Sequence, residues 1–228
     1  LFGYRLTQNF ARPYFAVSVQ DFWKRWHISL SSWLTDYIYT PLTRQKTIKI
    51  KFYTLMLWSL LITFVISGFW HGANWNFVAW GALHGGYIVI SLLLQKRWNT
   101  FARQIKLTER PRLYRGLKIG VTFLLICFAY ILFRANDMAD ALLMISHLGT
   151  GWNELTDNIK SVIGGNLAQF LLAAIGIAVL MGADLLHGRI KTDEAFAPGR
   201  IAGWVACYAA IVCIILFGAF YDDQQQFI

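Results

Sequence analysis

The stretch FYTLMLWSLLITFVISGFWHGANWNFVAWGALHGGYIVISLLL, residues 52–94, decides the fold of this chain. Its first nineteen residues, 52–70, carry no charge, and a second apolar run follows at 75–94. A helix needs about 20 mostly apolar residues to cross a bilayer. The two runs therefore predict two membrane-spanning helices, joined by the short turn HGAN at 71–74.

The composition of the whole chain also favours a membrane protein. Of the 228 residues, 57% are hydrophobic and only 14% are charged, whereas a soluble domain is nearer about 25% charged. Three more apolar segments bring the number of predicted spans to five: 119–133, 167–183 and 201–221. We therefore expect an all-α, polytopic transmembrane helix bundle that forms a single membrane domain over residues 1–228.

The basic residues of the chain predict its orientation. The net charge of +9 is carried by short runs between the apolar segments, which is typical of membrane topology rather than of nucleic-acid binding. On one side of the predicted membrane, 71–74 and 135–166 contain Lys160 as their only Lys or Arg. Because cytoplasmic loops carry the excess of Lys and Arg, we expect the turn at 71–74 in the outer half of the membrane. The basic runs of the other side are 43–51, 96–118 and 188–200.

A one-sided helix is predicted before the first span, over residues 22–38. Its large apolar residues recur with the i, i+3, i+4, i+7 spacing of a helix face, and Ser18 with Asp21 forms a capping box at its start. The segment is too polar to span, so we expect an amphipathic helix in the interface or a re-entrant one. A shorter amphipathic stretch is predicted at 135–148. The apolar face of the first helix consists of Trp23, Trp26, Leu30, Trp33, Leu34 and Tyr37.

His71 is the first candidate for chemistry, because it ends an uncharged run between Trp70 and Gly72. An imidazole at membrane depth is expected to be neutral, since burial disfavours its charged form. A neutral imidazole can take a proton from an alcohol and return it later, but it can also bridge helices by hydrogen bonds. The break GANWN at 72–76 favours a functional role, because irregular backbone at membrane depth is tolerated where it lines a cavity.

When each is taken alone, the other histidines are more simply explained by structural roles. His27 lies on the tryptophan side of the predicted helix, where a satisfied core histidine is the commoner case. His84 is expected to pack between helices, and His147 and His187 lie near segment ends. No H-x-x-x-H or H-E-x-x-H spacing occurs, so we predict no metal site. The three cysteines, Cys127, Cys207 and Cys213, lie in apolar segments and predict no disulfide framework.

Five residues are candidates for substrate binding. Trp70 and Trp75 offer aromatic faces that suit a sugar or a lipid, although interfacial anchoring explains many membrane tryptophans. Asn74 lies in the break beside them. Asp36 and Tyr37 can orient a substrate, although a solvated helix end explains Asp36 equally well. The chain has no G-x-S-x-G motif, P-loop or Rossmann glycines, so the hydrolase and nucleotide mechanisms that depend on them lack support.

Two motifs together resemble the membrane-bound O-acyltransferase family. They are FWKRWHISLSSWLTDYIYTPL at 22–42 and FVISGFWHGANWNFVAWGALHG at 64–85, and their order and spacing are specific in combination. The chain is most similar to the bacterial alginate O-acetylase branch, and YIYTPL favours the polysaccharide-acetylating members over the D-alanyl-transferring ones. The resemblance is dense over residues 2–85 and looser afterwards.

The resemblance implies an acyltransferase in which His71 corresponds to the catalytic histidine and His27 to the second signature histidine. It implies transfer of an acetyl group to hydroxyls of an exported polysaccharide such as alginate. The expected co-substrate is acetyl-CoA or another activated acyl group, with no tightly bound cofactor. The expected partners are membrane lipid, periplasmic acetylation proteins and the polysaccharide acceptor, without nucleic acid. The expected location is a bacterial inner membrane, crossed several times.

Two other functions remain open at this point. One is D-alanyl or other acyl transfer to a cell-envelope polymer, and the other is a transport or scaffold protein without catalysis. A proton-coupled transporter would usually show inverted repeats and buried acids, but no repeat occurs and Asp184 is the only acid near a span. The chain begins at Leu1 without a signal peptide, so we expect it to be the C-terminal part of a longer membrane protein.

Overall fold

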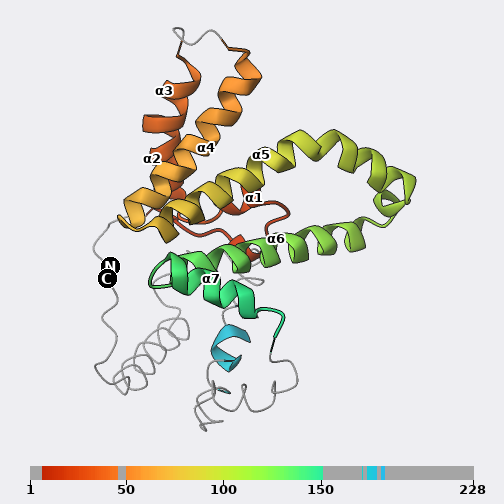
Figure 1. Cartoon of the computed structure of the whole chain (residues 1–228). Coiled ribbons are helices and arrows are strands. Elements are labelled where there is room, and N and C mark those ends of the chain that lie inside the picture. Colours follow the sequence, from red (N-terminus) through yellow and green to blue (C-terminus); the bar gives the residue numbers. More distant parts are fainter. Residues whose placement is uncertain (1–6, 46–49, 151–170, 172–173, 179–180, 183–228) are drawn as a thin grey trace, which may run out of the picture. The chain divides into compact units, whose positions relative to one another are not determined.

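The computed structural model describes residues 7–45, 50–150, 171, 174–178 and 181–182. Over these residues the regular structure is helical and contains no strand (Figure 1). Three helices are long and apolar enough to cross a membrane. They confirm the expected all-α, polytopic membrane fold and coincide with the first three predicted spans. These helices are α4 (Phe52–His71), α5 (Trp75–Gln104) and α6 (Pro111–Arg134).

Two of these helices are longer than their predicted spans. α5 was expected to end at residue 94 but continues to Gln104, and α6 was expected to begin at 119 but begins at Pro111. The added turns carry the basic residues of the 96–118 run, which hydropathy excludes from a span although they are good helix formers. Proline at the first position of α6 fits a helix start, because that position needs no N–H donor. Each helix therefore extends beyond its predicted span at the end that carries the basic residues.

The α4–α5 pair crosses at glycines that let the two backbones touch. A Cβ atom placed on Gly68 would collide with the Phe77 carbonyl oxygen, and one on Gly81 would collide with the Phe64 carbonyl oxygen. Small residues allow this close approach between membrane helices.

Asparagine side chains tie together the two turns on the side opposite the basic runs. Asn74 donates from Nδ2 to the Asn136 carbonyl at 3.0 Å, and Asn76 donates to the Ala135 carbonyl at 2.8 Å. The α4–α5 turn and the α6–α7 turn therefore lie at the same end of the helices (Figure 1). This arrangement agrees with the predicted topology, which puts 71–74 and the segment after α6 on one side. The amphipathic stretch at 135–148 forms α7 (Met138–His147).

The predicted single helix over 22–38 is wrong in its boundaries. Instead α1 (Val19–Trp23) ends before a break, and α2 (Ile28–Leu34) begins after it. From Ile28 the chain stays helical through the π-helical turn η2 (Thr35–Tyr39) and α3 (Thr40–Thr43). Ser18 caps α1 by accepting a hydrogen bond from the Asp21 N–H, as predicted.

The break between α1 and α2 is stabilised by Asn9, which precedes both helices in the sequence. The Asn9 carbonyl accepts from the Ile28 N–H, and its side-chain oxygen accepts from the Ser29 N–H, both at 3.0 Å. His27, between the helices, has a left-handed backbone with φ of 45°. Asn9 thus satisfies helix donors that would otherwise be free, and α2 begins in a new direction after α1.

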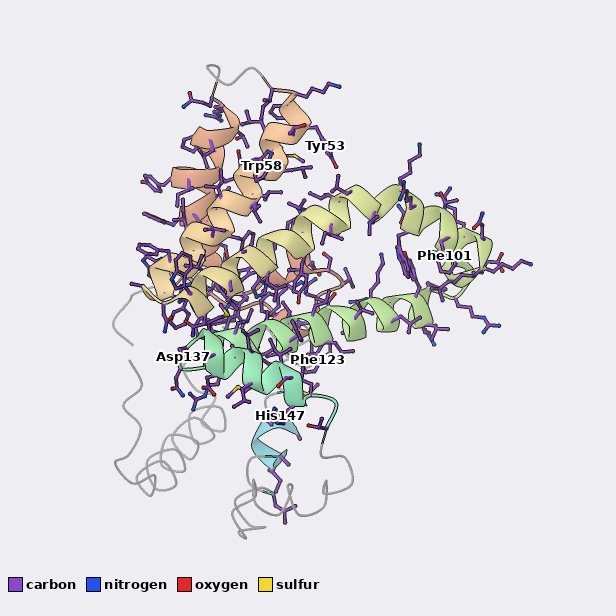
Figure 2. All side chains as sticks on the ribbon, in the orientation of Figure 1. Tyr53, Trp58, Phe101, Phe123, Asp137 and His147 are labelled. Carbon is purple, nitrogen blue, oxygen red and sulfur yellow. The ribbon has the colours of Figure 1, made fainter. Side chains whose placement is uncertain are left out.

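The outer surfaces of the spanning helices are apolar. Tyr53 and Trp58 project from α4, Phe101 from α5 and Phe123 from α6 (Figure 2). The buried face of α4 is different, because it carries the small polar residues Ser59, Thr63 and Ser67. A helix with lipophilic residues outside and small polar residues inside is typical of a membrane bundle.

The chain divides into two compact units, Leu1–Asn153 and Glu154–Ile228. In the second unit the residues that the structure describes are helical and fall within the predicted span at 167–183. The span predicted at 201–221 lies outside the described residues. The interpretation of 1–228 as one membrane domain stays a prediction.

Candidate active site

His71 is the last residue of α4, and its ring is half-buried among aromatic side chains. The ring centroid lies 4.9 Å from that of Trp70 and 5.2 Å from those of Trp80 and Phe133, all edge to face. These contacts come from α4, α5 and α6, so three helices fix the position of one imidazole. The helix ends there because Gly72 follows in an extended conformation.

His27 is brought to His71 from the α1–α2 break. The two histidines belong to different elements but lie close enough for a charge on His27 to act on His71. The Nδ1 atom of His27 is buried and has no hydrogen-bond partner. The sequence motifs predict both histidines as candidate catalytic residues, and the fold brings them close together.

Three more buried polar atoms without a hydrogen-bond partner belong to residues around His71. They are the Ser67 hydroxyl, one turn before His71 on α4, the Trp80 indole nitrogen and the Asn76 side-chain oxygen. Trp80 touches the His71 ring, and Asn76 lies one turn before Trp80 on α5. Buried polar groups in proteins are nearly always hydrogen-bonded, and exceptions need an explanation. Their gathering at one place is typical of a site that receives a polar ligand.

His84 also contacts Trp80, and one of its ring nitrogens is hydrogen-bonded to another helix. Its ring is 1% exposed, and its Nδ1 atom accepts a hydrogen bond from the Trp23 indole N–H at 3.2 Å. Its centroid is 4.8 Å from that of Trp80. This agrees with the expected packing role, because the bond joins α1 to α5. Trp23 and His84 both pack edge to face against the Trp80 ring.

A cavity of about 620 Å³ lies between the α2–η2 helix and the faces of α4 and α5. On α4 its lining extends from Met56 to Ser67, which corresponds to about 16 Å of helix at about 1.5 Å per residue. It thus begins near the basic end of α4 and reaches the turn that precedes His71, which is not itself in the lining. Burial raises the pKa of Tyr39, also in the lining, so its phenol stays a hydrogen-bond donor.

The other predicted site residues occupy three different places. Asp36 is in the lining of the cavity, whereas Tyr37 is 68% exposed and packs against Trp33. Trp70 and Trp75 are 58% and 74% exposed at the α4–α5 turn. The Asn74 side chain accepts from the Trp75 N–H and donates to the Asn136 carbonyl, so it is engaged in holding the turns.

Sequence patterns did not single out Ser67, Asn76 or Trp23. A serine in an apolar run is common in membrane helices, and its burial depends on how α4 meets its neighbours. The only available signal for Ser67 was its position four residues before His71, since side chains at i and i+4 lie on one helix face. Nothing local distinguishes Trp23, because its partner is on another helix.

The described residues contain no group of three or more His, Cys, Asp or Glu side chains that could hold a metal ion. The polar groups around His71 are imidazole, hydroxyl, amide and indole groups. A neutral imidazole accepts a proton, and hydroxyl and N–H groups bind carbonyl or alcohol oxygens. Such a set suits transfer between two oxygen-bearing substrates.

Comparison with known proteins finds relatives whose names describe the transfer of acetyl or D-alanyl groups. The chain is 33% identical to a "probable alginate O-acetylase" of Azotobacter vinelandii, over 88% of this chain and 39% of the relative. It is 38% identical to a peptidoglycan O-acetyltransferase of Helicobacter pylori, over 62% of this chain and 24% of the relative. It is 30% identical to a teichoic acid D-alanyltransferase of Streptococcus thermophilus, over 60% of this chain and 36% of the relative.

The chain thus spans about two fifths or less of the length of these relatives. The family profile of the membrane-bound O-acyltransferases matches residues 2–134, which include both histidine motifs and all three spanning helices. With the helical membrane fold and the paired histidines, this match identifies the chain as a member of the membrane-bound O-acyltransferase family.

Proposed function

We propose that the whole protein is an acyltransferase of a bacterial inner membrane that moves an acetyl group to hydroxyls of an exported polysaccharide. The observation that carries this proposal is the meeting of His71 and His27 beside buried polar atoms that have no partner. The names of the relatives support an acetyl group and a polymer acceptor. Alginate is one example of such a polysaccharide.

His71 acts as the general base in this proposal. Its neutral imidazole takes the proton of the acceptor hydroxyl while that oxygen attacks the carbonyl carbon of the acyl donor. The bond between the carbonyl carbon and its leaving group then breaks, and the leaving group receives the proton from the imidazolium. The products are the acetyl ester and the protonated leaving group. The aromatic contacts of His71 support this role by fixing the ring in one orientation.

His27 orients the substrates or stabilises the negative charge that develops on the carbonyl oxygen. Its free buried Nδ1 atom and its electrostatic interaction with His71 support a place in the same centre. Preorganised polar groups at a developing oxyanion lower the barrier of acyl transfer. His27 can alternatively help to hold the donor.

The donor and the acceptor approach from opposite sides of the membrane. The donor, acetyl-CoA or another activated acyl group, enters from the basic side along the cavity, where Asp36 is in the lining. The acceptor meets the exposed faces of Trp70 and Trp75, with Asn74 beside them as a further binding candidate. Tyr37 is a binding candidate near the cavity, because it follows Asp36 on the α2–η2 helix. Periplasmic acetylation proteins are expected partners, and the acetyl group can pass through one of them before it reaches the polymer.

A second acyl group is favoured by one observation. The D-alanyltransferase relative shares 30% of aligned residues over 60% of this chain. The same base and the same attack on a carbonyl would serve D-alanine. Membranes given labelled acetyl donor or labelled D-alanyl donor distinguish the two groups by which label enters polymer or partner protein. A transport or scaffold protein would transfer neither label.

The test of His71 uses the full-length protein with His71→Ala, in cells that lack their own copy. We expect acetyl esters on the exported polymer to be abolished, while the amount of protein in the membrane stays unchanged. His147→Ala is the matched control, because His147 is exposed and its Nδ1 contacts its own helix at the Leu143 carbonyl. Polymer acetylation that survives His71→Ala would remove His71 from the mechanism.

A further inference from the structure

Ser67 presents a hydroxyl that is buried and unpaired on the wall of the cavity. The residue is 1% exposed, its Oγ atom has no hydrogen-bond partner, and it contributes to the cavity lining. A serine inside a helix ordinarily bonds to the carbonyl four residues earlier. Ser67 does not do so, and its hydroxyl therefore remains available to a molecule in the cavity.

The neighbouring hydroxyl on the same helix face shows the ordinary arrangement. One turn earlier, Thr63 donates to the Ser59 carbonyl at 2.6 Å, although Thr63 is also in the cavity lining. Ser59 is as deeply buried as Ser67 but is not in the lining. Of the three small polar residues on this face, Ser67 alone combines a place in the cavity with an unpaired hydroxyl.

The position of Ser67 relative to His71 indicates which part of a substrate this hydroxyl would bind. Side chains at i and i+4 of a helix lie on one face, with Cβ atoms about 5–6 Å apart. Ser67 thus stands where the cavity ends and the His71 centre begins. Its surroundings in the cavity are apolar, with Phe64 and Ile88 in the lining. An uncharged hydroxyl in an apolar wall suits a neutral carbonyl better than a phosphate or a carboxylate, which need charged or multiple donors.

We propose, on the basis of the function proposed above, that Ser67 binds the carbonyl oxygen of the acyl group in the cavity. The hydroxyl donates to this oxygen and holds the carbonyl carbon next to the acceptor hydroxyl that His71 deprotonates. During the attack, the carbonyl oxygen gains negative charge, so the hydrogen bond strengthens in the transition state. When the leaving group departs, the carbonyl re-forms in the ester product and Ser67 is unchanged.

The experiment compares three variants of the full-length protein in cells that export the polymer: Ser67→Ala, Ser67→Thr and Ser59→Ala. Cells receive [14C]acetate, and the initial rate of ester formation on the polymer is divided by the amount of protein in the membrane. We expect Ser67→Ala to lower this rate by about a hundredfold to a thousandfold, the range for loss of one donor to an oxyanion. Ser67→Thr keeps the hydroxyl and should recover part of the rate. The control Ser59→Ala should stay close to the parent, because Ser59 is not in the cavity lining.

A second measurement separates binding from a structural role. Ser67→Ala should melt in detergent at the same temperature as the parent or higher, because the lost hydroxyl leaves no protein group unpaired. A hydroxyl that only supported the helix packing would lower the melting temperature and the rate together. That result overturns the inference.

The outcomes also distinguish this inference from the proposed function. If His71→Ala abolishes ester formation while Ser67→Ala keeps the rate of Ser59→Ala, the function stands and the role of Ser67 is wrong. If the parent forms no ester, or if His71→Ala keeps full activity, the proposed function itself fails.

Discussion

His27 holds a backbone conformation that glycine adopts freely and other residues seldom do, with φ of 45° and ψ of 55°. A left-handed conformation costs a residue with a Cβ atom roughly 1–2 kcal/mol. Asn9 contributes to keeping the chain in this conformation, because it accepts from the two N–H groups that follow. An imidazole retained at such a position, with one buried nitrogen free, is typical of a functional residue.

Replacing His27 by glycine distinguishes the role of the imidazole ring from the role of the left-handed backbone conformation. We expect His27→Gly to keep the stability within about 1 kcal/mol, because relief of strain offsets the added freedom of the unfolded chain. We expect polymer acetylation to fall strongly, because the ring is lost from the His71 centre. Measurement of melting in detergent and of acetyl esters on the polymer checks both parts.

The matched control for this variant is Arg12→Gly. Arg12 also has a left-handed backbone, with φ of 53°, but it precedes the short helix η1 (Pro13–Phe15). It should tolerate glycine without loss of acetylation. Full acetylation by His27→Gly would show that this position matters for the chain path alone.

Both histidines could be predicted as candidates from the sequence, but their surroundings could not. The motif around His71 ends an uncharged run, and this feature can be recognised from the amino-acid sequence alone. The unpaired hydroxyl of Ser67 is not visible, because burial and partners depend on where α2 and α5 lie. The bond between Trp23 and His84 likewise joins distant helices. Long-range pairs of single side chains leave no periodic signal.

At the scale of the elements, the α4–α5 hairpin depends on the absence of side chains at its crossing. We expect Gly81→Ala to destabilise the protein by about 1–3 kcal/mol or more, because the new methyl group collides with the Phe64 carbonyl. The melting temperature in detergent and the amount of protein in the membrane measure this effect. Gly86→Ala is the control, since it is on the same helix and has open space around its Cβ position. Equal behaviour of the two variants would contradict the close crossing.

The first helix carries a pH-dependent contribution to stability. Burial alone would raise the pKa of Asp21, but the hydrogen bond and charge of Arg25 and the Val17 N–H hold it below its ordinary value. The Arg25 Nε atom donates to the carboxylate at 2.9 Å. A carboxyl whose pKa is lowered by folding stabilises the protein above its unfolded pKa of about 3.9. This stabilisation is lost as the pH falls through the folded pKa.

Asp21→Asn tests this contribution. At pH 7 the variant should melt at a lower temperature than the parent, by an amount typical of a partly exposed ion pair and one hydrogen bond, about 1 kcal/mol. The difference should shrink as the pH is lowered from 5 toward about 3. A difference that stays constant over this range would show that the Asp21 charge is not involved.

The helices differ in how well sequence predicts them. Apolar length identifies all three spanning helices, because lipid requires it. Their ends on the basic side were missed, since charged turns outside the membrane have no hydropathic signal. The break at His27 was missed because the apolar spacing of 22–38 continues across it, and Asn9, which caps the second helix, lies in another segment. The cap at Ser18 was found because capping chemistry is local.

At the scale of the whole molecule, the described part has two chemically different ends. The end with the α4–α5 and α6–α7 turns is held by asparagine hydrogen bonds and contains His71. The ends of α5 and α6 away from these turns carry the basic residues. The cavity begins near the basic end of α4 and stops one turn from His71. If basic residues face the cytoplasm, the proposed catalytic centre lies nearer the outer face, where an exported acceptor would be found.

This orientation predicts the accessibility of single cysteines. In a full-length protein whose native cysteines, including Cys127, are replaced by serine, Ala73→Cys lies in the exposed α4–α5 turn and Arg112→Cys in the first turn of α6. A membrane-impermeant maleimide added to spheroplasts should label position 73, because that turn faces outward. Position 112 should react only after the membrane is permeabilised, because the basic segment faces the cytoplasm. The reverse pattern would put His71 on the cytoplasmic side, where it could not reach an acceptor that has already been exported.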